Sequence, residues 1–574
     1  MSLFGNLYVG AGGLQTGQNA LNTTAHNLAN VGTQGYTRQQ VLLADNKYTT
    51  IHKDIHAISN MQTGLGVTYS QTRTVRDYFL DQSYRQEVGR SAFYETSYNT
   101  MQEVETLLGE LDGESFNESL DNLYISLKEL AKNPASSVNQ GLVITRASEF
   151  IERANSVYNS LCTYQDNLNK QVEQGVDRIN DIADRIYQLN NDIVLIEAGG
   201  VEKANDLRDE RDKLLDELGK LGKISYKEDM VGSVDVYFEQ HLLASRDVKN
   251  KIELYIEDGA DFYMPYWKLD AQQLGGGKLD ISKAKVFNLN QTISTSMNTD
   301  IGGLKAMLVA RGDHRADYTD IPDPSYYAGG AADPQYLADM KTYDKVTSSS
   351  VIMNVQAEFD NLLHAIIDGV NGVLKEASDN ADKALQDSSG DPNAISDYMK
   401  MVDPVTGNKI PIQLFTRVAV DLTKPVSYAK GDESTLYSLG NVVVNPQLMK
   451  TPAMMGFIND LKEEDFTTAK KLQEAFEQKE YKLNPNVETK TNLVDYYSGI
   501  VSQIGNTGAV FKSIHQSQET TVATIDNARQ QVAGVSDDEE LENMIRYQNA
   551  YNASSRFINV IDEMLEHVLS TLGR

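Results

Sequence analysis

The sequence predicts a multidomain α+β protein in which the terminal α-helices pair as a coiled coil. An elongated helical rod domain and β-rich or mixed outer lobes are inserted in the middle. Three observations lead to this prediction. Both ends repeat apolar residues every seven positions, residues 168–196 repeat them every three or four, and residues 223–254 alternate apolar with polar. A chain of 574 residues is also too long for one core and predicts roughly three or four domains.

A helix is expected at the N-terminus, where leucines fall seven residues apart. The second seam position of this heptad is weak, because it holds Gly10 and Gly17. Glycine costs up to about 1 kcal/mol relative to alanine inside a helix, so this helix should be disordered alone and fold when a partner covers its leucines. The leucines of this stripe are Leu7, Leu14, Leu21 and Leu28.

A second heptad helix is expected at the C-terminus. Ser536 and Glu539 have the spacing of a capping box, and the acidic run from Asp537 to Glu540 suits a helix N-terminus. Ser554 is the polar defect in an otherwise apolar seam. We therefore expect the two terminal helices to pack on each other and on neighbouring copies. The seam consists of Met544, Tyr547, Tyr551, Ser554, Ile558, Ile561, Leu565, Val568 and Leu572.

The elements between the ends follow from the same patterns. A helix over 168–196 should turn at Gly199–Gly200 and run back over 205–218, where Asp209 and Lys213 are spaced for an i,i+4 pair. Strands are expected over 223–254, a surface loop over 319–343 and a helix over 351–374. Residues 386–490 mix strand-like segments with turns and an acidic, lysine-containing helix, and helical pattern resumes near 492.

These elements predict four domains. Residues 1–60 and 520–574 form a terminal helical domain that is disordered in the monomer, and residues 61–225, 345–385 and 490–519 form the helical rod. Residues 226–344 form a β-rich outer domain, and residues 386–489 form a mixed α/β outer lobe.

The composition excludes several classes of protein. With 81 Asp and Glu against 52 Lys and Arg, the formal charge of −29 repels nucleic acid and anionic membranes. The sequence contains no run of about 18 apolar residues, which is the length that a membrane-spanning helix needs. Cys162 is the single cysteine, which excludes an intramolecular disulfide. No Lys or Arg precedes Arg38, so a Sec signal is not expected, and the protein is either cytoplasmic or exported by another route.

No motif predicts an enzyme, a cofactor or a metal. His52 and His56 have i,i+4 spacing but no marked third ligand. The glycines of 10–13 fail the G-x-G-x-x-G pattern because Gln15 holds its third position. Cys162 lacks the basic neighbour typical of a nucleophile. Helix capping accounts for the acidic run near the C-terminus. We expect no catalytic, cofactor-binding or metal site.

Five stretches nevertheless resemble a known family. The stretch LNTTAHNLANVGTQGYTRQQ, residues 21–40, is similar to the signature of bacterial flagellar rod, hook and hook-associated proteins, and its Gly-Tyr-Thr-Arg-Gln version is closest to the hook-associated members. Further blocks resemble that family in order along the chain. They are GLGVTYSQTRTVRDYFLDQSYRQE at 64–87, ANDLRDERDKLLDEL at 204–218, DYYSGIVSQIG at 495–505 and DEELENMIRYQNAYNASSRFI at 538–558.

The resemblance implies a structural, non-enzymatic function. It implies an adaptor at the junction between hook and filament, needed for filament assembly and motility, which leaves the cytoplasm through the flagellar type III channel and resides in the extracellular flagellum. The implied partners are other copies in a ring or helical layer, the hook protein, the next hook-associated protein on the filament side, and an export chaperone at the C-terminal helix. No nucleic acid, membrane or cofactor is implied.

The resemblance also places the terminal helices in the inner tube of the axial structure, with residues 30–38 turning the chain outward. Asn27 and Asn30 should satisfy backbone groups at the helix end, and Gly35 should supply a geometry that other residues resist. Tyr36 and Arg38 are the expected subunit contacts, although a loop that satisfies itself remains an alternative. Two other functions stay open, namely another axial protein (hook or distal rod) and an outer lobe that binds surfaces.

Overall fold

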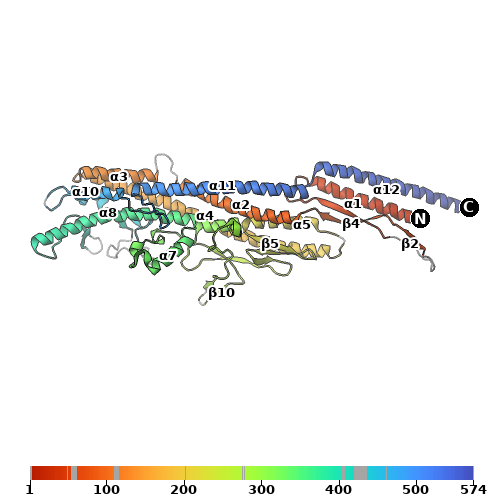
Figure 1. Cartoon of the computed structure of the whole chain (residues 1–574), viewed down its shortest axis with the longest axis horizontal. Coiled ribbons are helices and arrows are strands. Elements are labelled where there is room, and N and C mark those ends of the chain that lie inside the picture. The colour runs from red at the N-terminus through yellow and green to blue at the C-terminus, as the bar shows by residue number, and fades with distance from the viewer. Residues whose placement is uncertain are drawn as a thin grey trace.

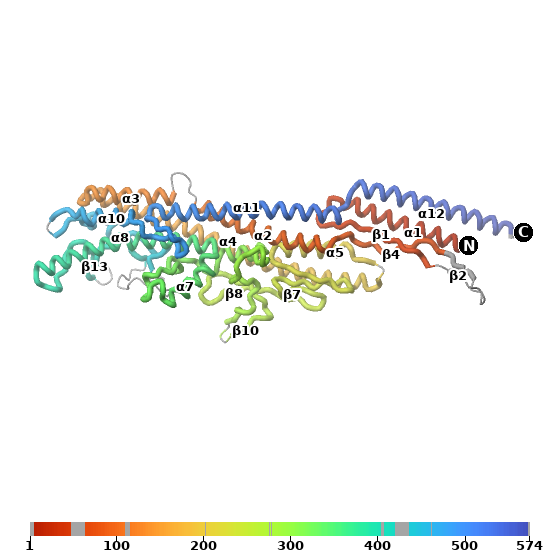
Figure 2. Tube along the Cα trace, in the orientation of Figure 1, coloured from red at the N-terminus to blue at the C-terminus, as the bar shows by residue number. Residues whose placement is uncertain are grey.

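The computed structural model describes residues 3–47, 49–52, 61–108, 115–200, 202–274, 276, 278–402, 407–418, 436–460 and 462–572. The molecule is elongated, and both chain ends lie at the same end of it (Figure 1). The long helices run nearly parallel to its long axis, and the small sheets lie along one side (Figure 2). The predicted fold class is confirmed.

The end that carries both termini is built from two helices and a strand hairpin, which we call the terminal unit. Strands β1 and β4 pair antiparallel, with a shift of register between Leu42 and Leu43. The unit contains α1 (Leu3–Ala29), β1 (Gln39–Asp45), β2 (Thr49–His52), β3 (Met61–Thr63), β4 (Val67–Thr74) and α12 (Asp537–Leu572).

The rest of the long axis is a bundle of helices, which we call the rod. Its central member is α4, which at 61 residues is about 90 Å long. The expected turn at Gly199–Gly200 is confirmed, and α5 runs back along α4 from there. The rod contains α2 (Tyr78–Leu108), α3 (Phe116–Lys132), α4 (Ser137–Glu197), α5 (Asn205–Leu221), α8 (Val351–Ser389) and α11 (Leu493–Ala533).

Helix α4 passes through two hydrophobic cores. Its first half packs with α3, α8 and α11, and this core also contains buried apolar residues farther along the chain, among them Phe415, Leu448 and Phe476. Its second half packs with α5, α6 and the strands of the β-rich region. One buried stripe along a single helix therefore joins both cores, which is why the apolar period of three and four persists for so long.

The β-rich region is made of small antiparallel sheets. The order β5-β6-β7 forms its three-stranded sheet, and β8 pairs with β9. Asparagines of α4 fix these sheets to the rod, since Asn190 bonds both the N–H and the C=O of Val234, and Asn180 does the same for Ile252. The elements are β5 (Ile224–Glu228), β6 (Val234–Phe238), β7 (His241–Ala244), β8 (Ile252–Tyr255), β9 (Met264–Trp267), β10 (Gln272–Gln273), β11 (Leu279–Asp280) and α6 (Gly303–Arg311).

Residues 386–490 mix strands and helices as expected. Strands β12 (Lys400–Val402) and β13 (Lys409–Pro411) pair, as do β14 (Phe415–Arg417) and β15 (Val442–Val444). The acidic, lysine-containing helix is α10 (Phe466–Glu477), preceded by the short α9 (Pro446–Lys450).

The surface loop expected over 319–343 is wrong in its second half. Helix α7 (Pro334–Lys345) forms there, because Asp333 accepts a hydrogen bond from the Gln335 N–H and Pro334 occupies the first helical turn. The domain division stays a prediction. Residues 61–74, which it assigns to the rod, form β3 and β4 and pair with strands of the terminal unit.

Candidate assembly site

The terminal helices pack antiparallel, with their closest approach at glycines. A Cβ atom at Gly17 would lie 3.3 Å from Tyr551 Cβ, and one at Gly10 would lie 2.7 Å from Ile558 Cγ1. Between them, a Cβ at Gly13 would lie 2.6 Å from Ser554 Oγ. The glycines that weaken α1 in isolation therefore let α12 approach its backbone. On another side of α1, a Cβ at Gly12 would lie 2.7 Å from the Val67 carbonyl oxygen of β4.

Most of the predicted seam residues lie in this packed pair, but few are fully covered. Ile561 is buried and Val568 is exposed, since α12 continues past the start of α1 (Figure 1). The leucines of α1 and the other seam residues whose burial is described are half-buried, namely Leu7, Leu14, Leu21, Leu28, Met544, Tyr547, Tyr551, Ser554, Ile558 and Leu565. Their role in contacts between subunits stays a prediction.

Several large apolar side chains of α12 are exposed on different sides of the helix, and the sequence analysis did not identify them. We call these side chains together the open face. Ile545 is 61 % exposed and Met564 is 52 % exposed. Ile545 and Met564 fall outside the two seam positions, as do the other members of the open face except Val568, so a search for apolar residues off the heptad could have found them. The open face consists of Leu541, Ile545, Phe557, Val560, Met564, Val568 and Leu569.

The loop after α1 forms a compact turn. Asn30 Nδ2 donates to the His26 carbonyl oxygen at 3.0 Å and so satisfies the helix end as expected. Gly35 has φ of +85°, a conformation that side chains resist, which also agrees with the expectation. Asn27 does not act on the end of α1 as expected. Its side-chain amide instead accepts from the N–H of Gln39 and donates to the C=O of Gln39, where β1 begins.

Asn27, Tyr36 and Arg38 meet Glu540 at the bend between α11 and α12. Asn27 Nδ2 donates to Glu540 at 3.1 Å, and Arg38 Nε donates to it at 2.8 Å. The Tyr36 hydroxyl donates to Asn27 Oδ1 at 2.8 Å, and the Arg38 N–H donates to the Ala533 carbonyl oxygen. Glu540 is 2 % exposed. We call these residues the elbow network. Capping alone therefore does not account for the acidic run.

Burial and nearby carboxylates, including Asp209 and Glu540, raise the pKa of Tyr36, so its hydroxyl keeps its proton at neutral pH. Within one chain, Tyr36 and Arg38 thus bind partners of their own chain. Any additional contact with a neighbouring subunit stays a prediction.

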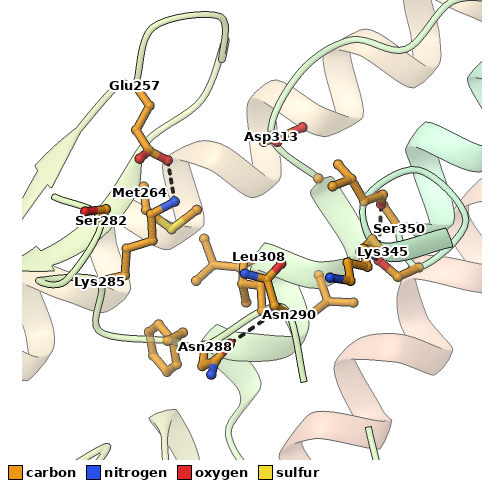
Figure 3. A pocket seen from close by; sticks show the side chains of 16 residues that line it. Glu257, Met264, Ser282, Lys285, Asn288, Asn290, Leu308, Asp313, Lys345 and Ser350 are labelled. Carbon is orange, nitrogen blue, oxygen red and sulfur yellow. Dashed lines mark hydrogen bonds and ion pairs between the residues drawn. The ribbon is translucent and has the colours of Figure 1, made fainter. Parts of the chain in front are cut away.

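The described residues also enclose a cavity away from the terminal unit. A cavity of about 390 Å³ lies between the β-rich region and the start of α8, with a 2.6 Å ion pair between Lys285 and Glu257 on its wall (Figure 3). In the described ranges, no cluster of His, Cys, Asp and Glu could hold a metal. His52 ends strand β2, and His56 lies outside the described residues. Cys162 is half-buried, and burial raises the pKa of its thiol.

None of the described helices is long and apolar enough to cross a membrane.

Comparison with protein families matches the rod most extensively. The family described as flagellar hook-associated protein FlgK, helical domain, matches residues 101–387, which is half of the chain. The chain belongs to the FlgK family of flagellar hook-associated proteins. Two further families match the ends: the flagella basal body rod protein family over residues 7–37, and the C-terminal family of the flagellar basal body rod FlgEFG proteins over residues 529–571.

Curated relatives match over nearly the whole length. The chain is 25% identical to flagellar hook-associated protein 1 of Bacillus subtilis, over 100% of this chain and 99% of that protein. It is 23% identical to the Salmonella typhimurium protein and 22% identical to the Escherichia coli protein of the same name, each over 97% of this chain and 98% of the relative. A structure of the flagellar hook junction protein FlgK from Burkholderia pseudomallei aligns with a TM-score of 0.49 at 13% identity, over 79% of this chain and 100% of that chain.

This FlgK-family chain is thus a structural protein of the bacterial flagellum, where it works with other axial components. The two rod-protein matches cover α1 with its loop and α12, which are the elements that meet in the elbow network.

Proposed function

We propose that this chain is a non-enzymatic adaptor at the junction between hook and filament and that its copies assemble through their terminal helices. The open face of α12 is the observation that supports this most. A helix that keeps this many large apolar side chains exposed after it has paired with another helix is typical of an element that another chain covers. The half-buried leucines of α1 favour the same conclusion.

The proposed partners follow from this position in the flagellum. Other copies in a ring or helical layer cover the open face, the hook protein contacts one side of the layer, and the next hook-associated protein contacts the other. The chain reaches this extracellular site from the cytoplasm by type III export. The names of the full-length relatives support the hook-associated position.

A paired set of substitutions tests assembly through the open face. Ile545→Ser with Met564→Ser removes two large exposed apolar groups, whereas Gln548→Ser with Asn552→Ser changes exposed polar positions of the same helix. The first variant should be exported but not incorporated, so cells shed filament subunits and lose motility, and the second should behave as wild type. Normal filaments on the first variant would refute the proposal.

Position in the flagellum separates a junction adaptor from a hook or distal rod protein. Immunogold labelling of the assembled chain should give a thin zone at the distal end of the hook. Label along the whole curved segment, or below it, would assign the chain to the hook or the rod instead.

An export chaperone is proposed to hold α12 before assembly. Its expected surface is the seam, because the seam is apolar and is covered by α1 only after the helices pair. Alanine at Met544, Tyr551 and Ile558 should weaken chaperone binding in a pull-down. Binding at wild-type strength would show that the chaperone uses a different surface.

A further inference from the structure

The terminal unit meets the rod at a polar joint formed by the first two turns of α5. The Thr37 N–H donates to Asp209 Oδ2 at 3.0 Å, and Gln39 Nε2 donates to Asp206 Oδ1 at 3.2 Å. Asn205 Nδ2 donates to the Thr72 carbonyl oxygen of β4 at 3.2 Å. The NVGTQGYTR loop and the NDLRDERD helix start, more than a hundred and fifty residues apart, therefore bind each other.

This joint has no hydrophobic core behind it. Each cluster of buried apolar residues found in the described ranges lies within the rod and the outer regions, and none includes a residue of the terminal unit. Two domains of one chain are expected to move relative to each other unless the interface between them is large and apolar. The angle between the terminal unit and the rod is therefore set by a few hydrogen bonds.

Asp209 is the buried group of this joint, and Thr37 is its main hydrogen-bond partner. The residue is 7 % exposed, and its Oδ2 receives the Thr37 N–H. Its Oδ1 is buried without a hydrogen-bond partner. A buried carboxylate oxygen without a hydrogen-bond donor is costly, so an arrangement that brings a donor to Oδ1 recovers free energy.

Arg76 is the donor within reach. It lies between β4 and α2, on the connection that any tilt of the terminal unit must move. Its Nη1 is 3.9 Å from the free Oδ1 of Asp209, and it pairs more closely with Asp81 and Asp212. A small displacement of this connection exchanges Asp212 for Asp209 as the partner of the guanidinium.

We propose that the joint has two positions. In the closed position, described here, Asp209 holds the Thr37 N–H. In the open position the terminal unit tilts, Thr37 leaves, and Arg76 takes the Asp209 carboxylate. This inference concerns the single chain and rests on the proposed function only for its use, which is to let one adaptor fit two layers of different geometry.

Protonation of Asp209 affects the two positions differently. Burial raises the pKa of Asp209 to about 6, against hydrogen bonds from Thr37 and the charge of Arg76, which lower it. Three titratable groups face Asp209. They are Arg76 on the connection between β4 and α2, Tyr36 in the loop after α1, and Asp212 on α5 itself. A neutral carboxyl still accepts the Thr37 N–H but no longer attracts Arg76. Low pH therefore favours the closed position.

Spin labels on the full-length chain can measure both positions. Cysteines replace Ala25 on α1 and Gln174 on α4, which are exposed, in a Cys162→Ser background. Double electron–electron resonance should give two distances at about pH 7.5, and the fraction of the open distance should fall up to about tenfold at about pH 5, as the ionised fraction of a group with pKa near 6 does.

Two variants test whether the pH response comes from Asp209 and not from another carboxylate. Asp209→Asn keeps the acceptor for Thr37 without the charge and should give the closed distance at both pH values, and Arg76→Gln should do the same. One unchanged distance in the wild type, a pH response that survives in Asp209→Asn, or a distribution with no defined distance would each overturn the proposal. None of these results bears on assembly, which the open-face variants test.

Discussion

Two adjacent glutamates at the start of α12 have very different surroundings. Glu540 is buried and receives hydrogen bonds from Asn27 and Arg38. The Glu539 side chain is 62% exposed, and its only described ion pair is with the same arginine at 2.8 Å. The position of a carboxylate relative to the bend, and not its mere presence in an acidic run, decides what it contributes.

Replacing these two glutamates by alanine should therefore have unequal effects. Glu540→Ala leaves Asn27 and Arg38 without their buried acceptor and should lower the local free energy of unfolding by about 2–3 kcal/mol. Glu539→Ala removes an exposed ion pair and should change it by about 0–1 kcal/mol. Amide hydrogen exchange of the first turns of α12 measures both, and equal effects would contradict the elbow network.

Glu358 of α8 predicts a pH-dependent stability. Burial raises the pKa of this carboxyl to about 7, although Asn354, Asn484 and Gln503 donate to it. Because the folded pKa exceeds the unfolded value, the contribution of Glu358 to stability is fully present below about pH 4.5 and is lost as pH rises through 7.

Glu358→Gln removes this ionisation and keeps an oxygen for the same three donors. The variant should be more stable than wild type by about 3 kcal/mol at pH 8 and by roughly half that at pH 5.5, measured as the shift of the urea transition. The exposed Glu95→Gln should show no such difference between the two pH values. An equal gain at both pH values for Glu358→Gln would contradict the assigned pKa.

Single residues could be predicted from the sequence only where their partners are local. Gly35 and Asn30 act on their own turn, so their roles follow from conformation and short spacing. Glu540 and Asp209 could not be recognised, because their partners lie 513 and 172 residues away along the chain. Asp209 was expected to pair with Lys213, but tertiary burial gives it the Thr37 N–H instead.

At the scale of elements, the glycines of α1 make a testable helix contact. Gly13→Ala improves helix propensity by up to about 1 kcal/mol, but its Cβ would lie 2.6 Å from Ser554 Oγ. The single substitution should therefore destabilise the helix pair by about 1 kcal/mol.

Ser554→Ala removes the oxygen that Gly13→Ala would meet. The double variant should recover the loss, with a coupling energy of about 1–2 kcal/mol in a double-mutant cycle of thermal unfolding. A cycle with no coupling would show that the two helices are not in contact at this position. Gln18→Ala, on the exposed side of α1, serves as the control for helix propensity alone.

Long helices were predictable because their apolar period persists over many turns. The continuity of α4 from residue 137 was not predictable in the same way, because the first half of this helix packs into a different core from the second half. Helix α7 was missed for another reason. Proline and glycine in 319–333 dominated the composition, although Asp333 and Pro334 are an ordinary helix start. Strand pairing needs contacts between distant segments, which no local pattern supplies.

At the scale of the whole molecule, the formal charge of −29 opposes self-association of the same chain. Raising the salt concentration from about 0.01 M to about 0.1 M shortens the Debye length from about 30 Å to about 10 Å. Light scattering should therefore report a higher average mass at the higher salt concentration. The Ile545→Ser, Met564→Ser variant should not respond, and a mass that falls with salt would mean that ion pairs, not the open face, hold copies together.

The position of both chain ends at one end of the molecule has a consequence for biosynthesis. Helix α1 is translated long before the α12 residues that face Gly10, Gly13 and Gly17. The rod and outer regions can acquire their cores while synthesis continues, but the side of α1 that α12 covers has no native partner until α12 has been made. Each newly made subunit therefore passes through a stage in which its most apolar terminal stripe is available to whatever binds it first.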